Sequence, residues 1–167
     1  MSNQVLVAIG SNLPGPDGQA PRSNAEWAVD ALAGRPGLRL LALSSWYRSR
    51  PVPASDQPDY VNGVARFDSG LAPHALLGML QEVEARAGRV RTVPNAARVL
   101  DLDLLAVGDR IIRSESLLLP HPRLQDRAFV LLPLCDVAPD WRHPVLGRTA
   151  ESLCRDVDAG GVERLAA

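Results

Sequence analysis

This sequence of 167 residues has little cysteine and no long run of apolar residues, which excludes several common classes of protein. It has two cysteines, Cys135 and Cys154, which are too few for a disulfide framework and form no Cys-x-x-Cys metal motif. No apolar run approaches the roughly 18 residues of a membrane span, and the N-terminus lacks the basic start of a signal peptide. We therefore expect a cytoplasmic protein whose thiols stay reduced.

An excess of charge of one sign is also lacking, because the formal net charge is -1. Near-neutrality gives no electrostatic argument for nucleic acid or for an acidic membrane surface as a partner. A site for an anion must then be built from a local group of basic residues. The length suits one domain with a sizeable core, and we place that domain at residues 1–167.

Hydrophobic periodicity predicts strands over residues 5–9, 38–47, 60–67 and 99–107, and helices over residues 23–33 and 73–87. The order strand, helix, strand, strand, helix, strand predicts an α+β fold. This is a ferredoxin-like βαββαβ antiparallel sheet with helices packed on one face and a C-terminal extension. Residues 48–58 suit a loop, and residues 129–137 and 149–157 suit short helices of the extension. The fold serves many functions and therefore indicates none of them.

The ends of the two longer helices carry recognisable signals. Ser23 and Glu26 have the spacing of a capping box, and Gly34 suits the end of the same helix. Pro73 opens the second helix and Gly88 closes it.

Two aspartates, Asp101 and Asp103, stand two residues apart in the last predicted strand. Residues at i and i+2 of a strand share a face, so the two backbone positions lie about 6.6 Å apart and the carboxylates project together. Leu102 and its neighbouring leucines then face the core. Close carboxylates repel unless a cation lies between them, and such hard oxygen ligands suit Mg²⁺ bound together with phosphates. The alternative is an amphipathic strand whose polar face meets water, because an isolated Asp-x-Asp is a short motif.

The segment before this strand is basic, with Arg89, Arg91 and Arg98 in the loop and Arg86 at the helix end. Guanidinium groups match the oxygens of phosphate. Arginines beside an acidic pair therefore have the composition of a metal–triphosphate site. A solvated loop that balances nearby glutamates is the alternative.

Further candidates lie outside this segment. His121 stands between two prolines, which stiffen its backbone and hold the imidazole where it could contact a phosphate or a leaving group. Tyr60 and Asn62 share a strand face, where a ring can stack on a flat heterocycle and a carboxamide can read its edge. Arg127 and Phe129 could add a phosphate clamp and an aromatic surface. A loop histidine without a task and a packing pair across strands are the corresponding alternatives.

Taken together, these segments resemble the 6-hydroxymethyl-7,8-dihydropterin pyrophosphokinase family. The resemblance runs from residue 5 to about residue 149. It rests on AIGSNL at 8–13, SSWYRS at 44–49, DQPDYVN at 56–62, GRVR at 88–91, RVLDLD at 98–103 and PHPRLQDRAFV at 120–130. Several motifs in this order over most of the chain make the resemblance specific.

The resemblance implies an ATP-dependent pyrophosphokinase of folate biosynthesis. The enzyme transfers pyrophosphate from ATP to the hydroxymethyl group of 6-hydroxymethyl-7,8-dihydropterin and releases AMP. It implies ATP and this pterin as partners and two Mg²⁺ ions bound with ATP, and we expect a monomer without nucleic acid or membrane partners. The implied residues are Asp101 and Asp103 for the metal; Arg89, Arg98 and the two aspartates for catalysis; Ser49, Val52, Tyr60, Asn62 and Phe129 for the pterin; and Gln81, Glu84, Arg91, Arg98, His121 and Arg127 for ATP.

One segment departs from the family pattern. Residues 92–98 read TVPNAAR and keep only the final arginine of the Arg-Trp-Gly-Pro-Arg-like run that is usual there. Ser116 also stands where many relatives have a basic residue. We expect the altered loop to close only partly over the substrates, which lowers turnover. The alternative function is that of a catalytically weak paralogue that binds pterin or nucleotide.

Overall fold

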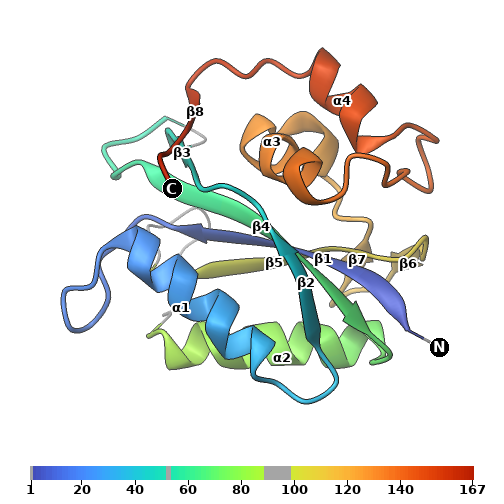
Figure 1. The fold of residues 1–167 in the computed structure, drawn as a ribbon, viewed down its shortest axis with the longest axis horizontal. Coiled ribbons are helices and arrows are strands. Elements are labelled where there is room, and N and C mark those ends of the chain that lie inside the picture. Colours follow the sequence, from blue (N-terminus) through green and yellow to red (C-terminus); the bar gives the residue numbers. More distant parts are fainter. Residues whose placement is uncertain (1, 52–53, 89–98) are drawn as a thin grey trace.

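The computed structural model describes residues 2–51, 54–88 and 99–167, and Figure 1 shows how its elements are arranged. The strands are β1 (Asn3–Ser11), β2 (Arg39–Leu43), β3 (Tyr47–Ser49), β4 (Tyr60–Ser69), β5 (Asp101–Val107), β6 (Ile112–Arg113), β7 (Leu118–Leu119) and β8 (Val162–Arg164). The helices are α1 (Pro21–Ala33), α2 (Pro73–Arg86), α3 (Ala128–Val137), α4 (Ala150–Asp156) and the single 3-10 turn Leu124–Asp126. None of the helices in these three ranges is long and apolar enough to cross a membrane.

The main sheet has the strand order β5-β1-β4-β3-β8, with β2 also paired to β4. Every pairing in this sheet is antiparallel. The two central strands, β1 and β4, are the first strands of the two βαβ units, and β5 lies outside β1. This arrangement confirms the predicted ferredoxin-like α+β fold, to which the extension adds β8 as an edge strand.

One predicted strand is interrupted. The sequence predicts a single strand over 38–47, but β2 ends at Leu43 and β3 begins four residues later. Between them, the Ser44 hydroxyl accepts a 2.9 Å hydrogen bond from the N–H of Val64. Trp46 there turns its buried ring over Gly63, where a Cβ atom would lie 2.5 Å from a ring carbon. The prediction of one strand is wrong because this tryptophan needs to enter the core, and only glycine at the facing position leaves it room.

The two faces of the sheet are covered by different helices. One apolar cluster joins the sheet to α1 and α2 and contains Leu32, Phe67 and Leu76. A second cluster joins the opposite face to α3 and α4 and contains Leu131 and Leu134. Figure 1 shows the two pairs of helices on opposite sides of the sheet. Burying one such leucine contributes about 2–3 kcal/mol, so the extension is an integral part of the fold.

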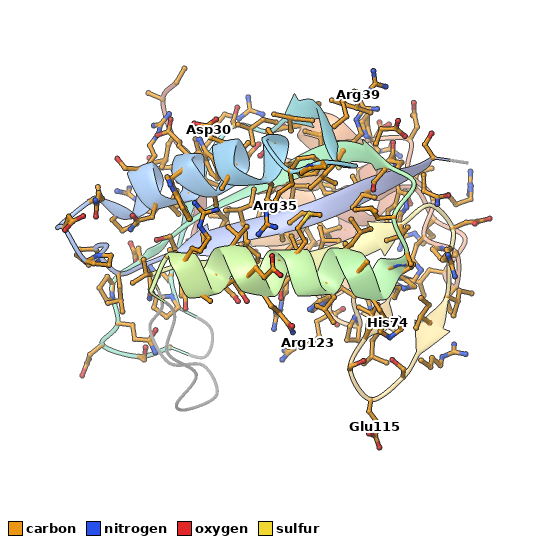
Figure 2. All side chains as sticks on the ribbon, turned by 90° about the horizontal axis from the view of Figure 1, so that it is seen from below. Asp30, Arg35, Arg39, His74, Glu115 and Arg123 are labelled. Atoms are coloured by element: carbon orange, nitrogen blue, oxygen red, sulfur yellow. The ribbon has the colours of Figure 1, made fainter. Side chains whose placement is uncertain are left out.

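The two helices of the first face lie side by side, as Figure 2 shows. Arg35, just after α1, forms a 2.7 Å ion pair with Glu82 of α2. Because Glu82 is largely exposed, a pair of this kind contributes at most about 1 kcal/mol. The apolar cluster beneath therefore holds the two helices together, and the ion pair only aligns them.

The predicted helix ends are partly right. α1 begins at Pro21 with Ala20 as its N-cap, and no side chain caps it, so the predicted capping box at Ser23 is wrong. Proline is favoured at this first position because its fixed φ suits the helix and its missing N–H would be unpaired anyway. The predicted C-cap at Gly34 is confirmed. α2 begins at Pro73 as predicted, and Gly88 follows its end with a positive φ of 90°.

Candidate active site

A cavity of about 400 Å³ opens on the α3 side of the sheet. This volume lies in the range of ordinary small-molecule sites. Its walls come from β1, β3, β4 and β5, from the loops after β3 and β7, and from the start of α3. The lining residues are Ala8, Ile9, Gly10, Ser49, Arg50, Pro51, Gln57, Tyr60, Asn62, Gly63, Asp101, Asp103, His121, Pro122, Arg123, Arg127, Phe129 and Val130.

The acidic pair lies on β5 as the sequence predicts. Asp101 and Asp103 are half-buried and line the cavity, whereas Leu102 and Leu104 are buried in the first apolar cluster. The two carboxylates therefore share one face of the strand. In the described part of the chain no three acidic, histidine or cysteine side chains gather as a metal site.

The other wall of the cavity combines an amide with two rings. Asn62 is only 6% exposed, and its Nδ2 donates a 2.7 Å hydrogen bond to the Ser49 hydroxyl. A Cβ atom on Gly10 would lie 3.5 Å from Asn62 Oδ1 and 3.7 Å from Cδ1 of Tyr60. The glycine thus leaves open the space beside the amide oxygen and the ring. Phe129, at the start of α3, lines the same cavity.

The pairing of β1 with β4 and with β5 places the amide and the acidic side chains on the same face of the sheet. Gly10 of β1 pairs with Asp101 of β5 on one side and with Asn62 of β4 on the other. Residues that pair across antiparallel strands point to the same face, and adjacent strands lie about 4.8 Å apart. Asp101 and Asn62 therefore stand about two strand spacings apart, with glycine on the floor between them.

The loop after β7 brings a histidine over the acidic pair. The N–H of His121 donates a 2.9 Å bond to the Leu105 carbonyl, which fixes the loop to β5. Burial lowers the pKa of His121, and the nearby Arg127 charge lowers it further. The ring is therefore neutral near pH 7. Its Nδ1 accepts a 3.3 Å bond from the N–H of Arg123, so the neutral ring carries its proton on Nε2.

Arg127 joins the charged wall to the aromatic one. Its guanidinium lies over the Phe129 ring at 5.5 Å from the centroid. Burial lowers the pKa of Arg127, and so does the Arg123 charge, while Asp103 and Asp101 oppose this shift. The arginine stays protonated at neutral pH because its ordinary pKa is so high. It therefore supplies a positive charge within the field of both aspartates.

Two predicted ATP residues lie elsewhere. Gln81 is exposed on α2 and does not line the cavity. Glu84 is 2% exposed, and its Oε2 accepts a 2.8 Å hydrogen bond from the N–H of Leu102. This carboxylate thus holds β5 between the two aspartates from the α2 side. Their predicted contacts with ATP stay predictions.

Eight predicted residues come together in the cavity: Ser49, Tyr60, Asn62, Asp101, Asp103, His121, Arg127 and Phe129. Four others, Val52, Arg89, Arg91 and Arg98, lie outside the described residues, as does the altered loop segment. The cavity also contains Arg50, Gln57 and Arg123, which the sequence interpretation missed. Each lies within or next to a motif that carried the resemblance, which was the available signal.

Comparisons with known proteins show which family the chain resembles. A family model described as 7,8-dihydro-6-hydroxymethylpterin-pyrophosphokinase (HPPK) matches residues 6–139. A 2-amino-4-hydroxy-6-hydroxymethyldihydropteridine pyrophosphokinase of Pseudomonas aeruginosa is 44% identical over 165 residues, which cover 99% of this chain and 98% of the relative. A protein of the same name from Synechocystis is 40% identical over 157 residues, which cover 94% of this chain and 77% of the relative.

A solved structure shares the fold. The crystal structure of Plasmodium falciparum HPPK-DHPS with pterin and p-hydroxybenzoate matches with a TM-score of 0.77 at 13% sequence identity. The match covers 100% of this chain and 47% of the Plasmodium chain, so this chain spans about half the length of that protein.

Proposed function

The chain belongs to the 7,8-dihydro-6-hydroxymethylpterin-pyrophosphokinase family and is an ATP-dependent pyrophosphokinase, and we propose that the cavity between the sheet and α3 is its active site. The enzyme transfers pyrophosphate from ATP to the hydroxymethyl group of 6-hydroxymethyl-7,8-dihydropterin in folate biosynthesis. The pterin oxygen forms a bond to the β-phosphorus and loses its proton, the bond between the α- and β-phosphates breaks, and AMP leaves.

The observation that carries the site assignment is the row Asp101, Gly10 and Asn62 across three adjacent strands. It sets an acidic group and an edge-reading amide on one floor, about two strand spacings apart. A flat ring held at Asn62 then directs its substituent toward the aspartates, where the phosphates are expected. This separation matches a reaction that joins a heterocycle to a polyphosphate.

The pterin half of the proposal uses four residues of the cavity. Tyr60 and Phe129 bring their rings to stack on the pterin, and Asn62 reads its edge. Because Asn62 Nδ2 is engaged by Ser49, its Oδ1 is the atom left to accept from the pterin N–H groups. Ser49 then acts by fixing the orientation of this amide.

The phosphate half uses charge. Arg127 lies where it can bind phosphate oxygens, and the Nε2–H of His121 can donate to the bridging oxygen that leaves with AMP. We assign Arg89, Arg91 and Arg98 to the triphosphate from the family resemblance. Catalysis on this account consists of positioning and charge stabilisation, with no covalent intermediate.

The acidic pair fits a magnesium site. Two carboxylates that share a strand face and line the cavity provide the hard oxygen ligands that Mg²⁺ prefers. Bound Mg²⁺ would neutralise the triphosphate and polarise it toward attack. We propose that Asp101 and Asp103 hold two such ions together with ATP. The expected monomeric state and cytoplasmic location stay predictions.

The test is to incubate the protein with MgATP and the pterin and to identify the nucleotide product. We expect AMP to form in equal amount to the pterin diphosphate. ADP coupled to the pterin would overturn the reaction. A rate that is unmeasurably slow while both ligands bind would instead favour the weak paralogue, which the enzyme names of the relatives do not favour.

A further inference from the structure

The row of residues that crosses the floor of the cavity continues beyond it. Asn62 of β4 pairs with Tyr47 of β3, and Tyr47 pairs with Arg164 of β8. Residues in register share a face, so Tyr47 and Arg164 point to the same side of the sheet as Asn62. Neither of these two residues lines the cavity. Their side chains form a separate polar group immediately beside it.

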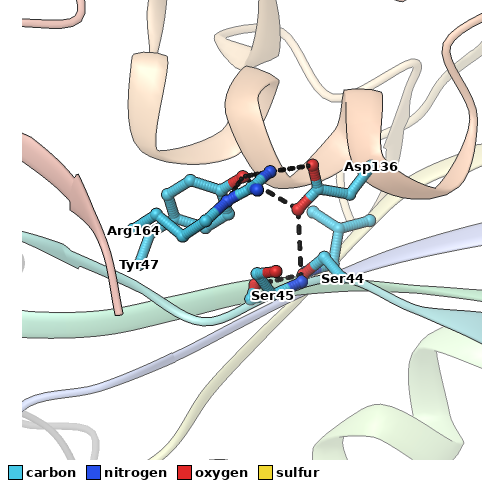
Figure 3. A network of polar contacts seen from close by, with 6 residues as sticks. Ser44, Ser45, Tyr47, Asp136 and Arg164 are labelled. Carbon is cyan, nitrogen blue, oxygen red and sulfur yellow. Dashed lines mark hydrogen bonds and ion pairs between the residues drawn. The ribbon is translucent and has the colours of Figure 1, made fainter. Parts of the chain in front are cut away.

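That group ties three segments together (Figure 3). The buried Tyr47 hydroxyl donates a 2.8 Å hydrogen bond to Oδ2 of Asp136 on α3, and the N–H of Ser45 donates to the same oxygen at 3.2 Å. Nη2 of Arg164 donates to Oδ1 of Asp136 at 2.9 Å and to the Tyr47 hydroxyl at 3.0 Å. One carboxylate thus receives donors from the sheet and from the C-terminal strand.

This polar group lies on the same helix as Phe129, one of the residues that line the cavity. Phe129 and Asp136 are seven residues apart on α3, which is close to two full turns, so they lie on the same side of the helix. Tyr47 and Ser49 are two residues apart on β3 and share its face. The Tyr47–Asp136 bond is therefore one contact between α3 and β3, and Phe129 and Ser49 lie further along the same sides of these two elements.

Ser49 and Phe129 both line the cavity proposed for the pterin. The neighbouring contact between the two elements is a polar bond of 2.8 Å. The buried leucines of α3 hold the helix against the sheet, and the hydrogen bond adds a directional constraint, because it weakens steeply when its distance or angle changes. The bond therefore limits how α3, and with it Phe129, can shift relative to β3.

We propose that Tyr47, Asp136 and Arg164 are positioning residues that set the width of the pterin pocket by fixing α3 to β3. This inference rests on the proposed pterin site. Arg164 of β8 adds to the contact between Tyr47 and Asp136. Its guanidinium also lies 5.6 Å from the centroid of the Tyr47 ring. Tyr47, Asp136 and Arg164 do not line the cavity, so their loss should affect binding through Phe129 and Ser49.

The experiment compares Tyr47→Phe and Asp136→Ala with the wild-type protein. The pterin dissociation constant is measured with 6-hydroxymethylpterin in the presence of α,β-methylene-ATP, whose cleavable bond is blocked. The affinity for this nucleotide alone is measured separately. We expect about tenfold weaker pterin binding in each variant, because small misplacements of a binding group have effects of this order, and nearly unchanged nucleotide affinity.

Two further variants separate positioning from general stability. Asp136→Asn keeps an oxygen for Tyr47 and Ser45, so we expect it to recover most of the affinity that Asp136→Ala loses. Glu163→Gln is the matched control, because it removes the ion pair of Glu163 with Arg48, which also joins β8 to β3 but points to the opposite face. We expect pterin affinity in this control to equal that of the wild type.

The outcomes are distinct. Equal losses for pterin and nucleotide, no rescue by Asp136→Asn, or the same loss in Glu163→Gln would each overturn the positioning role. The losses of Tyr47→Phe and Asp136→Ala should be less than additive in the double variant, because each single variant already removes the bond between Tyr47 and Asp136; fully additive losses would contradict this. If Asn62→Ala leaves pterin binding intact, the pocket assignment itself fails, independently of these three residues.

Discussion

Replacing Asn62 by alanine tests the pterin site at a buried polar group. The carboxamide is 6% exposed, with Nδ2 bonded to the Ser49 hydroxyl at 2.7 Å and Oδ1 facing the space above Gly10. Alanine removes the acceptor and leaves room that water can fill only in part. A pterin N–H that enters the pocket would then lose its protein partner.

The size of the effect follows from the cost of an unpaired donor. A buried hydrogen-bonding group left without a partner costs about 1–3 kcal/mol. At 25 °C this range corresponds to roughly a 5- to 150-fold increase in the pterin dissociation constant. The Ser49 hydroxyl also loses its bond to Asn62, so we expect a similar decrease in the free energy of unfolding. Binding must therefore be measured where both proteins are fully folded.

Titration calorimetry with 6-hydroxymethylpterin and α,β-methylene-ATP separates the two substrates. We expect Asn62→Ala to weaken the pterin selectively and to leave the affinity for the nucleotide within about twofold, because the amide lies two strand spacings from Asp101. Ser49→Ala is the control, since it frees the amide without removing its oxygen, and its effect should be smaller. Equal losses for both ligands, or a larger loss in Ser49→Ala, would refute the reasoning.

Three other perturbations test other parts of the site. Asp101→Asn or Asp103→Asn should abolish most turnover at saturating MgATP and leave the melting temperature nearly unchanged, because both side chains lie on the cavity face of β5; a melting shift with normal turnover would contradict the site. Glu84→Ala should lower the free energy of unfolding by about 1–3 kcal/mol in urea titrations, since the buried N–H of Leu102 loses its acceptor, and an unchanged urea midpoint would exclude that role. Burial lowers the pKa of His143 below 6.5, so as the pH falls through 6.5 the unfolded chain takes up its proton before the folded one. The free energy of unfolding should accordingly decrease below about pH 6.5, and less steeply in His143→Asn; identical slopes would exclude this contribution.

The acidic pair could be predicted from the sequence because a strand repeats every two residues. Asp101 and Asp103 alternate with leucines, so local pattern alone indicates which face each occupies. The buried role of Glu84 could not be predicted in this way. A glutamate on an amphipathic helix is expected to meet water, and its bond to Leu102 depends on how α2 packs against β5, which no local pattern reports.

The positioning group was missed for the same reason. Asp136 lies 89 residues from Tyr47 and 28 residues from Arg164. Each residue looks ordinary in its own segment: an aromatic in a strand, an acid on a helix and a base near the end of the chain. Their meeting depends on the pairing of β8 with β3 and on the packing of α3 over the sheet. Tertiary register decides such contacts, whereas the sequence pattern reports only the face of each element.

A bulge in the pairing of β5 with β1 lets this strand direct side chains both into the cavity and into the second apolar cluster. The pairing of β1 with β5 shifts between Leu6 and Val7, where Ala106 and Leu104 are the partners and Leu105 is passed over. Before this bulge the leucines enter the first cluster and the aspartates face the cavity; at the bulge Leu105 enters the second cluster instead. Bulges beside active sites commonly redirect side chains in this way.

The function of β5 also depends on a fixed pairing register with β1. A slip of one residue against β1 would turn both aspartates into the first apolar cluster and bring leucines to the cavity, since successive side chains alternate in direction. The regular part of the pairing fixes Asp101 opposite Gly10 and Asp103 opposite Ala8. Glu84 adds a second constraint from α2 by binding the N–H of Leu102, the residue between the two acids. A buried carboxylate on one face of the sheet thus keeps the acidic pair on the other.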